Sequence, residues 1–124
     1  MHGLTVAVDF DNCLVEYADN PLGEFILKPD ARGVIGKDHS QGVRFILNTS
    51  RYGRYLLPAI KFIKEERLPI EIRLSLSKIS ADLYIDDHNI FCKEVNWRDV
   101  DRELRRILDV QSKQENGDKC ISST

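Results

Sequence analysis

Apolar and polar positions divide the chain into segments of two different periods. Short apolar runs predict strands at residues 4–8, 43–47 and 83–85, and alternation of apolar and polar residues predicts an edge-like strand at residues 70–74. Apolar residues at helical spacing, with charged residues opposite, predict amphipathic helices, at residues 29–42, 56–66 and 96–110. Because parallel neighbours need crossover connections, this order predicts an α/β domain in three layers, Rossmann-like, with a mostly parallel sheet.

The parts of the chain outside this pattern are short. Residues 14–28 mix apolar side chains with a turn cluster of Asp, Asn, Pro and Gly, so we predict a small flap after the first strand and no cap domain. The polar residues 111–124 predict a disordered tail. Residues 1–110 then form a single domain, which fits the total length of 124 residues.

Composition narrows the range of partners and compartments. Lys and Arg number 18 against 20 Asp and Glu, so the net charge of −2 provides no general cationic field to hold a long nucleic acid. No apolar run approaches the ~20 residues that a membrane span needs. The three cysteines form no C-x-x-C pair and no apolar signal segment precedes the first strand, so we expect a cytoplasmic protein.

Polar side chains follow three of the predicted strands directly. They are Asp9 and Asp11 after the first strand, Asn48, Thr49 and Ser50 after the second, and Asp86 and Asp87 after the fourth. Open parallel sheets bind their ligands beyond the carboxyl ends of the strands. We therefore expect the three groups to converge on one crevice.

The acidic residues of these groups predict a cation site. Two like charges 4 Å apart repel by about 4 kcal/mol at an effective dielectric constant of 20. A site with a few carboxylate oxygens suits Mg²⁺, and no cluster rich in His or Cys competes for another metal. Each acidic pair alone is typical of a solvated turn, but their joint placement after apolar strands favours a functional site.

The same residues carry a resemblance to a known family. The stretches VAVDFDNCLVEY, FILNTSR and a lysine before ADLYIDDHN resemble, in order, the four motifs of the haloacid dehalogenase (HAD) superfamily, specifically its small phosphohydrolases without a cap domain. The resemblance covers about residues 4–110 and includes the PLGE segment and Gly42. It implies a Mg²⁺-dependent phosphatase, and the order and spacing of the motifs are more specific than any single motif.

The resemblance implies a division of labour between two acids. Asp9 would be the nucleophile that attacks phosphorus to give an aspartyl phosphate, and Asp11 would protonate the leaving oxygen and then activate water. Residues two apart on an extended backbone point to the same side, which agrees with this pairing. Asp11 also favours phosphoryl transfer over dehalogenation, because a halide leaves without a proton.

Further residues receive roles by the same resemblance. Thr49, or its neighbour Ser50, would hold a phosphoryl oxygen, and Lys78 would steady the phosphoryl group. The implied Mg²⁺ shell comprises Asp9, Asp11, Asp86 and Asp87, with Asp87 favoured over Asp86 as the direct ligand. The candidates for binding the remainder of an anionic substrate are Asn48, Ser50, Arg51, Arg54 and His88. Of these, Arg51, Arg54 and His88 could equally be exposed charges at the rim. Tyr52 and Tyr55 are further candidates for substrate contact.

The chain departs from the usual first motif, Asp-x-Asp-Gly-Thr, at Asn12 and Cys13. Asn tolerates left-handed backbone angles, so Asn12 is a mild change. Cys13 lacks a strong hydrogen-bonding hydroxyl, which leaves two interpretations: a reduced rate with sensitivity to oxidation, or a small buried apolar side chain, which we favour.

Two other classes of function stay open at this point. One is a non-catalytic Mg²⁺-binding interaction module, and the other is a receiver-like phosphoacceptor domain, although its acceptor Asp would follow a mid-chain strand, where this chain has Asn48 and Thr49. Without a cap the mouth of the site is open. The substrate is then either a small phosphorylated molecule, an exposed phosphate on a macromolecule, or one enclosed by a second subunit in a homo-oligomer.

Overall fold

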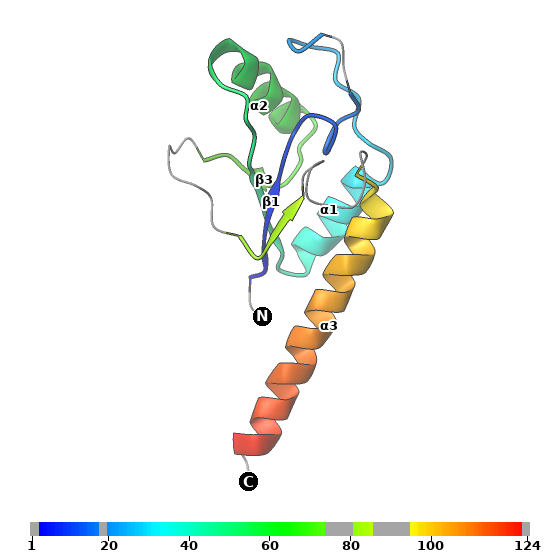
Figure 1. Ribbon diagram of the computed structural model, residues 1–124, viewed down its shortest axis with the longest axis vertical. Helices are drawn as coiled ribbons and strands as arrows, with labels where there is room; N and C mark the ends of the chain where they lie inside the picture. Colours follow the sequence, from blue (N-terminus) through cyan, green and yellow to red (C-terminus); the bar gives the residue numbers. More distant parts are fainter. Residues whose placement is uncertain (1–2, 18–19, 74–80, 86–94, 123–124) are drawn as a thin grey trace.

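The computed structural model describes residues 3–17, 20–73, 81–85 and 95–122, with side chains as far as residue 110 (Figure 1). Its centre is a four-stranded sheet in the order β3-β2-β1-β4, with every neighbouring pair parallel. The strands are β1 (Thr5–Val8), β2 (Arg44–Leu47), β3 (Ile70–Glu71) and β4 (Leu83–Ile85). The predicted α/β class and parallel sheet are confirmed. β3 is shorter than the predicted strand at residues 70–74.

The helices connect the strands and then close the domain. They are α1 (Ala31–Ser40), a 3₁₀ turn η1 (Gly53–Tyr55), α2 (Leu56–Glu65) and α3 (Trp97–Ser122). Asn96 caps α3, because its side-chain oxygen accepts a hydrogen bond from Arg98 N at 2.9 Å.

α3 continues past the point where the sequence predicted its end. Residues 111–122 are helical in the structure, whereas we predicted a disordered tail there. Gln, Lys and Glu are good helix formers, and a helix that is already nucleated adds residues without a further nucleation cost. Figure 1 shows this part of α3 projecting beyond the sheet and the other helices. The domain boundary at residue 110 therefore falls inside a continuous helix.

The described helices pack on one face of the sheet and share one apolar core with it. The sheet contributes alternate residues, Val6, Val8, Phe45, Leu47 and Ile85, and the helices contribute Val34, Ile35, Ala59, Ile63, Val100 and Leu104. Ala7 and Ile46, on the opposite face of the central strands, are also only 1% exposed. Burial of both faces explains the continuous apolar runs at β1 and β2. The third layer of the predicted arrangement stays a prediction, because the described helices form one layer.

The predicted flap follows β1 and is a short hairpin-like excursion. Val15 bridges antiparallel to Leu27, and the backbone bonds from Glu16 N to Ile26 O (2.7 Å) and from Lys28 N to Leu14 O (2.9 Å) close its base. Phe25 packs its ring edge-on against Phe10, with centroids 4.9 Å apart, and against Phe62 on α2. These contacts tie the flap to the core.

A buried ion pair joins α1 to α3 at the edge of the sheet where the strands begin. Asp38 is fully buried and accepts a hydrogen bond from Arg105 Nη2 at 2.7 Å. Burial, and after it the nearby Asp101 carboxylate, raise the pKa of Asp38 to about 6, although Arg105 opposes both. Asp101 bonds to Lys37 at 2.9 Å. Although burial alone would raise it, the pKa of Asp101 is lowered by hydrogen bonds from Lys37 and Asp38 and by the nearby cations.

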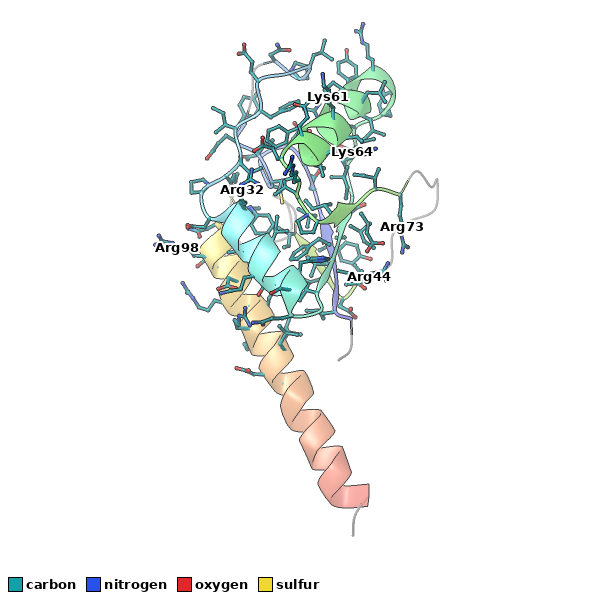
Figure 2. All side chains as sticks on the ribbon, turned by 180° about the vertical axis from the view of Figure 1, so that it is seen from behind. Arg32, Arg44, Lys61, Lys64, Arg73 and Arg98 are labelled. Carbon is teal, nitrogen blue, oxygen red and sulfur yellow. The ribbon has the colours of Figure 1, made fainter. Side chains whose placement is uncertain are left out.

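Several basic side chains reach the surface of the domain (Figure 2), and acids pair with a number of them. Arg32 pairs with Glu66, Arg44 makes two bonds of 2.9 Å to Glu71, and Arg98 pairs with Asp30. Exposed pairs of this kind contribute little stability, but they cancel charge locally. Within the described part of the chain, no helix is long and apolar enough to cross a membrane.

Candidate functional site

The candidate site lies where β1, β2 and β4 end together. Val8 is the register partner of both Leu47 and Ile85, so the three strands finish in one row. The ladder continues one step further through bonds from Asp9 N to Ile85 O (3.0 Å) and from Asn48 N to Val8 O (2.8 Å). Asp9 therefore leaves the central strand at the same edge as Asn48, as the sequence predicted.

The chain turns sharply after Asp9. Asp9 Oδ1 accepts a hydrogen bond from Phe10 N at 2.7 Å, and Leu14 N bonds back to Phe10 O at 3.1 Å. Asn12 has φ 53°, a left-handed conformation that Asn tolerates better than most residues. This backbone agrees with the expectation that Asn12, in place of the usual Gly, is a mild change. The turn holds Asp9 and Asp11 on a short, well-bonded loop.

Asp11 is held by an arginine from the next strand end. Arg51 Nε donates to Asp11 Oδ2 and Arg51 Nη2 donates to Asp11 Oδ1, both at 2.6 Å. Such a two-pronged pair fixes the plane of the carboxylate as well as its position. The Asp11 side chain keeps 48% of its surface exposed, while that of Arg51 keeps 7%.

The protein itself uses most of the Arg51 guanidinium. Its Nη1 also donates to Pro21 O at 2.6 Å, in the flap, and to Tyr55 O at 2.8 Å, at the end of η1. The guanidinium carbon lies 5.0 Å from the Phe10 ring centroid and 5.1 Å from that of Phe25. Arg51 thus connects the segments around the site, and its predicted contact with a substrate stays a prediction.

The remaining candidates after β2 are arranged around Thr49. The Thr49 hydroxyl accepts a hydrogen bond from Arg51 N at 3.1 Å, which bends the chain toward η1. Ser50 and Tyr52 are exposed. Arg54 is exposed as well and contacts Tyr55, its guanidinium lying 5.0 Å from the ring centroid. A backbone hydrogen bond therefore holds the Thr49 hydroxyl at the end of β2.

Cys13 connects the turn after β1 to two later elements. Its thiol is fully buried and donates to Ile85 O at 3.0 Å, while its carbonyl accepts a bond from Trp97 Nε1 at 2.8 Å. The favoured interpretation of Cys13 as a small buried side chain is confirmed. Trp97 is 1% exposed and packs at the start of α3. The end of β4 and the start of α3 are thus both anchored on the loop that carries Asp11.

Four predicted site residues lie outside the described part of the chain: Lys78, Asp86, Asp87 and His88. β4 ends at Ile85, one residue before the predicted acidic pair, in the row that also contains Val8. Within the described ranges, no group of three or more His, Cys, Asp or Glu residues could hold a metal ion. The described residues therefore contribute Asp9, Asp11, Asn48 and Thr49 to this edge, and the two acids after β4 stay a prediction.

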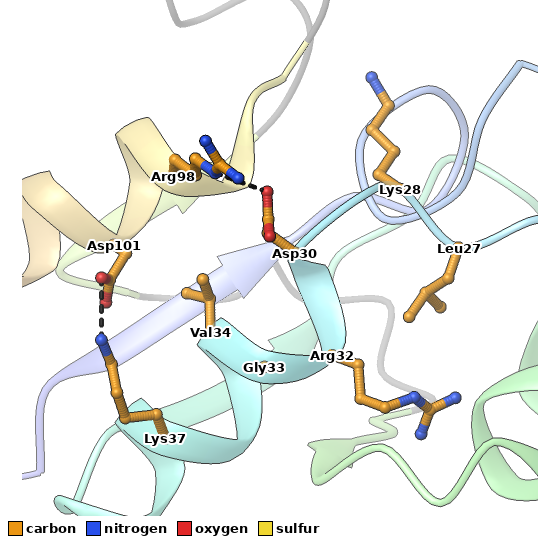
Figure 3. Close-up of a pocket in the computed structure, with 9 residues that line it drawn as sticks. All are labelled: Leu27, Lys28, Asp30, Arg32, Gly33, Val34, Lys37, Arg98 and Asp101. Carbon is orange, nitrogen blue, oxygen red and sulfur yellow. Dashed lines mark hydrogen bonds and ion pairs between the residues drawn. The ribbon is translucent and has the colours of Figure 1, made fainter.

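The sequence missed one buried cation near the flap. Lys28 is 5% exposed, and its Nζ donates to Val95 O at 3.3 Å. It borders a hollow of about 490 Å³ between the starts of α1 and α3 (Figure 3), where Arg98 bonds to Asp30 and Lys37 to Asp101. The charged groups of this hollow are thus largely paired with one another, and none of the predicted site residues lines it. The one feature of the sequence that could have drawn attention to Lys28 is its position directly before Pro29, at the end of the flap.

Comparison with known proteins supports the fold. No protein-family model matches this chain, and no curated protein matches it. A solved structure described as a conserved protein coded by a locus from Bacteroides thetaiotaomicron is similar to it, with a TM-score of 0.70 and 25% sequence identity. The match covers 85% of this chain and 92% of the other. This similarity agrees with a small Rossmann-like domain.

Proposed function

We propose that this protein is a Mg²⁺-dependent phosphohydrolase that removes a phosphoryl group through an aspartyl phosphate on Asp9. One observation carries the proposal: a carboxylate leaves the central strand of a parallel sheet at the edge where two neighbouring strands also end. Ligand sites of such sheets lie at this edge. The resemblance of the ordered motifs to the HAD superfamily adds the reaction type.

The proposed chemistry proceeds in two displacements. A carboxylate oxygen of Asp9 attacks phosphorus, the bond from phosphorus to the leaving oxygen breaks, and that oxygen keeps the electron pair and takes a proton from Asp11. A water molecule then gives a proton to Asp11 and attacks phosphorus, which releases inorganic phosphate and restores the Asp9 carboxylate. The bond from Phe10 N to Asp9 Oδ1 limits the rotation of the nucleophile.

Thr49 is suited to orient the phosphoryl group. Its hydroxyl oxygen accepts the bond from Arg51 N, and this leaves the hydroxyl proton for donation to a phosphoryl oxygen. Asn48 N is already used by Val8 O in the ladder, so Asn48 would act through its side chain. Lys78 keeps the role that the resemblance implies, as a cation beside the phosphoryl group.

A magnesium ion fits this edge of the sheet through Asp9. Mg²⁺ uses one or two carboxylates together with water and substrate phosphate oxygens, so a complete cage of protein ligands is not required. Asp11 fits less well than the sequence suggested, because the Arg51 guanidinium lies against both of its oxygens and would repel a second cation. We propose Asp9 with Asp86 or Asp87 as the protein ligands. The bound ion would neutralise charge on the phosphoryl oxygens.

The proposed substrate is a phosphomonoester, on a small molecule or at an exposed position of a macromolecule. The described flap is short and the Asp11 side chain is half exposed, which supports an accessible site. We place the activity in the cytoplasm, because Cys13 is a buried thiol that forms no disulfide among the described residues.

The direct test measures hydrolysis of p-nitrophenyl phosphate with and without Mg²⁺. We expect activity in wild type, loss on chelation with EDTA, and loss by at least about 100-fold in Asp9→Asn, because the amide is a poor nucleophile. Asp109→Asn is the matched control, since Asp109 is an exposed acid on α3, and it should keep the wild-type rate. Equal rates in wild type and Asp9→Asn would contradict the proposal.

Beryllofluoride separates the proposal from its two alternatives. A phosphatase should bind beryllofluoride on Asp9 in the presence of Mg²⁺ and should also turn over p-nitrophenyl phosphate. A receiver-like domain would bind beryllofluoride without sustained turnover. A non-catalytic module would bind Mg²⁺ but would neither bind beryllofluoride nor turn over p-nitrophenyl phosphate. Comparison of ¹⁹F spectra of wild type and Asp9→Asn measures the binding of beryllofluoride.

A further inference from the structure

The side chain of Arg51 is less accessible to solvent than an ordinary substrate-binding arginine. It is 7% exposed, while its partner Asp11 is 48% exposed. The rings of Phe10 and Phe25 lie near its guanidinium, both about 5 Å away. Cation–π contacts of this kind strengthen when water is excluded. A substrate can therefore approach Asp11 more easily than Arg51.

The donors of Arg51 are also largely occupied. Four bonds of 2.6 to 2.8 Å use its Nε, Nη1 and Nη2 atoms, two on the carboxylate of Asp11 and one each on the carbonyls of Pro21 and Tyr55. A phosphate that bound Arg51 with a two-pronged geometry would have to displace Asp11. This would separate the guanidinium from the group that it now orients.

The three partners of Arg51 belong to three segments around the site. Asp11 lies on the loop after β1, Pro21 lies in the flap and Tyr55 ends η1. Arg51 itself follows the end of β2, where Thr49 accepts the bond from its backbone nitrogen. A displacement of the flap would therefore strain or break contacts of the same guanidinium that fixes Asp11.

We propose that Arg51 is a positioning residue: it orients Asp11 toward the reacting group and ties the flap to η1, and it does not bind the substrate. This inference rests on the proposed function for its kinetic consequences. Its structural part, the coupling between the flap and the loop of Asp11, is measurable without activity.

The kinetic test compares kcat and KM for p-nitrophenyl phosphate in wild type, Arg51→Ala and Arg51→Lys. Misplacing a catalytic group lowers kcat, and we expect a loss of about 10- to 100-fold in Arg51→Ala with KM changed by less than about 2-fold. Arg51→Lys keeps the charge but not the planar fork, so it should recover only part of the rate. Arg44 also forms a two-pronged pair, with Glu71, and Arg44→Ala is the matched control with unchanged kcat.

Chemical rescue distinguishes positioning from general loss of structure. Arg51→Ala leaves a space beside the rings of Phe10 and Phe25, where the guanidinium lies in wild type, and a small guanidinium ion can enter it. Millimolar ethylguanidinium should raise kcat of Arg51→Ala several-fold, while ethylammonium, which has the same charge without the fork, should not, and neither should change Arg44→Ala. Unchanged kcat with a KM raised 10-fold or more in Arg51→Ala would instead make Arg51 a substrate ligand and overturn the inference.

Amide hydrogen exchange supplies the readout that needs no turnover. In Arg51→Lys, the flap amides of Glu16 and Lys28 should exchange at least about 10-fold faster than in wild type, while the core amide of Val6 keeps its protection. Faster flap exchange in a protein whose wild type lacks phosphatase activity would refute the proposed function and leave the coupling standing. If wild type is active but Arg51→Lys changes neither kcat nor flap exchange, the inference about Arg51 is refuted and the proposed function is not. If Arg51→Ala does not fold, Arg51→Lys supplies the test.

Discussion

Two arginine–aspartate pairs lie beyond opposite ends of β2, and their burial is reversed. Before the strand begins, Asp38 is 0% exposed and Arg105 reaches it with a side chain that is 33% exposed. Beyond the strand's end, Arg51 is 7% exposed and Asp11 is 48% exposed. One pair thus buries its acid and the other buries its base.

This difference separates a structural role, at Asp38, from the role that we propose for Asp11. A buried carboxylate cannot regain water, so the Arg105 pair contributes mainly to holding α1 against α3. A half-exposed carboxylate can meet a substrate, and a guanidinium kept from solvent can orient it without competing for the same phosphate. The comparison leads us to expect that changes at one end affect stability and changes at the other affect activity.

The largest effect on stability should come from Arg105→Met. This variant keeps part of the apolar stem but leaves Asp38 buried without its main cation, which costs about 3 kcal/mol in the free energy of unfolding. Arg51→Met should cost less, about 1 to 2 kcal/mol, because Asp11 can be solvated in its place. Urea unfolding measures both values.

The same two variants should separate in activity. Rate per folded molecule should stay at the wild-type value in Arg105→Met and fall in Arg51→Met. If both variants lost stability and activity to the same extent, the two pairs would have one common role and the comparison would fail.

A smaller effect should appear in the pH dependence of stability. Because the pKa of Asp38 is raised in the folded state, from 3.8 to about 6, the folded protein binds the proton more tightly than the unfolded chain does. Stability from this group is therefore fully present below pH 4 and is lost as the pH rises through 6, by roughly 1 to 3 kcal/mol. The lowered pKa of Asp101 acts in a separate range of pH: its contribution is present above pH 4 and is lost as the pH falls below that value.

Asp38→Asn should flatten this part of the profile. The amide cannot ionise, so the difference in unfolding free energy between pH 4.5 and pH 7 should be smaller in the variant than in wild type. Thermal melts across this range supply the measurement. Asp30→Asn, which alters an exposed pair at the opposite end of α1, should leave the slope at its wild-type value.

The smallest effect should come from the contact that connects α3 to the site loop. Trp97→Phe removes the donor to the buried Cys13 carbonyl and should cost about 1 to 2 kcal/mol. Since Cys13 lies two residues after Asp11, we also expect a fall in kcat of a few-fold. Unchanged kcat in a destabilised Trp97→Phe would show that the start of α3 supports the fold without influencing the site.

Much of the fold was predictable because the signals are local. The apolar runs at β1 and β2 are continuous, since both faces of these strands are buried, and such runs are recognisable without tertiary information. The end of α3 was placed too early, because a polar helix that projects from the domain lacks an apolar stripe to reveal it. Asp38 was missed although its position carried a signal: it falls four residues after Val34 and three after Ile35, on the buried side of α1.

The candidate site was predictable only in part. Asp9 and Asn48 lie at one edge because parallel strands end together, and that follows from the order of the elements. The use of Arg51 did not follow, since its partners are separated from it by up to 40 residues along the chain.

By itself the sequence determined which segments are strands and helices, that the sheet is mostly parallel, and that an acid follows its first strand. These properties depend on periodicity and chain order, which are local or nearly local. Only the tertiary structure decided which arginine meets which aspartate, and which member of each pair keeps its contact with water. Those outcomes depend on packing between segments far apart in the chain, where the rings of Phe10 and Phe25 and the face between α1 and α3 exclude solvent.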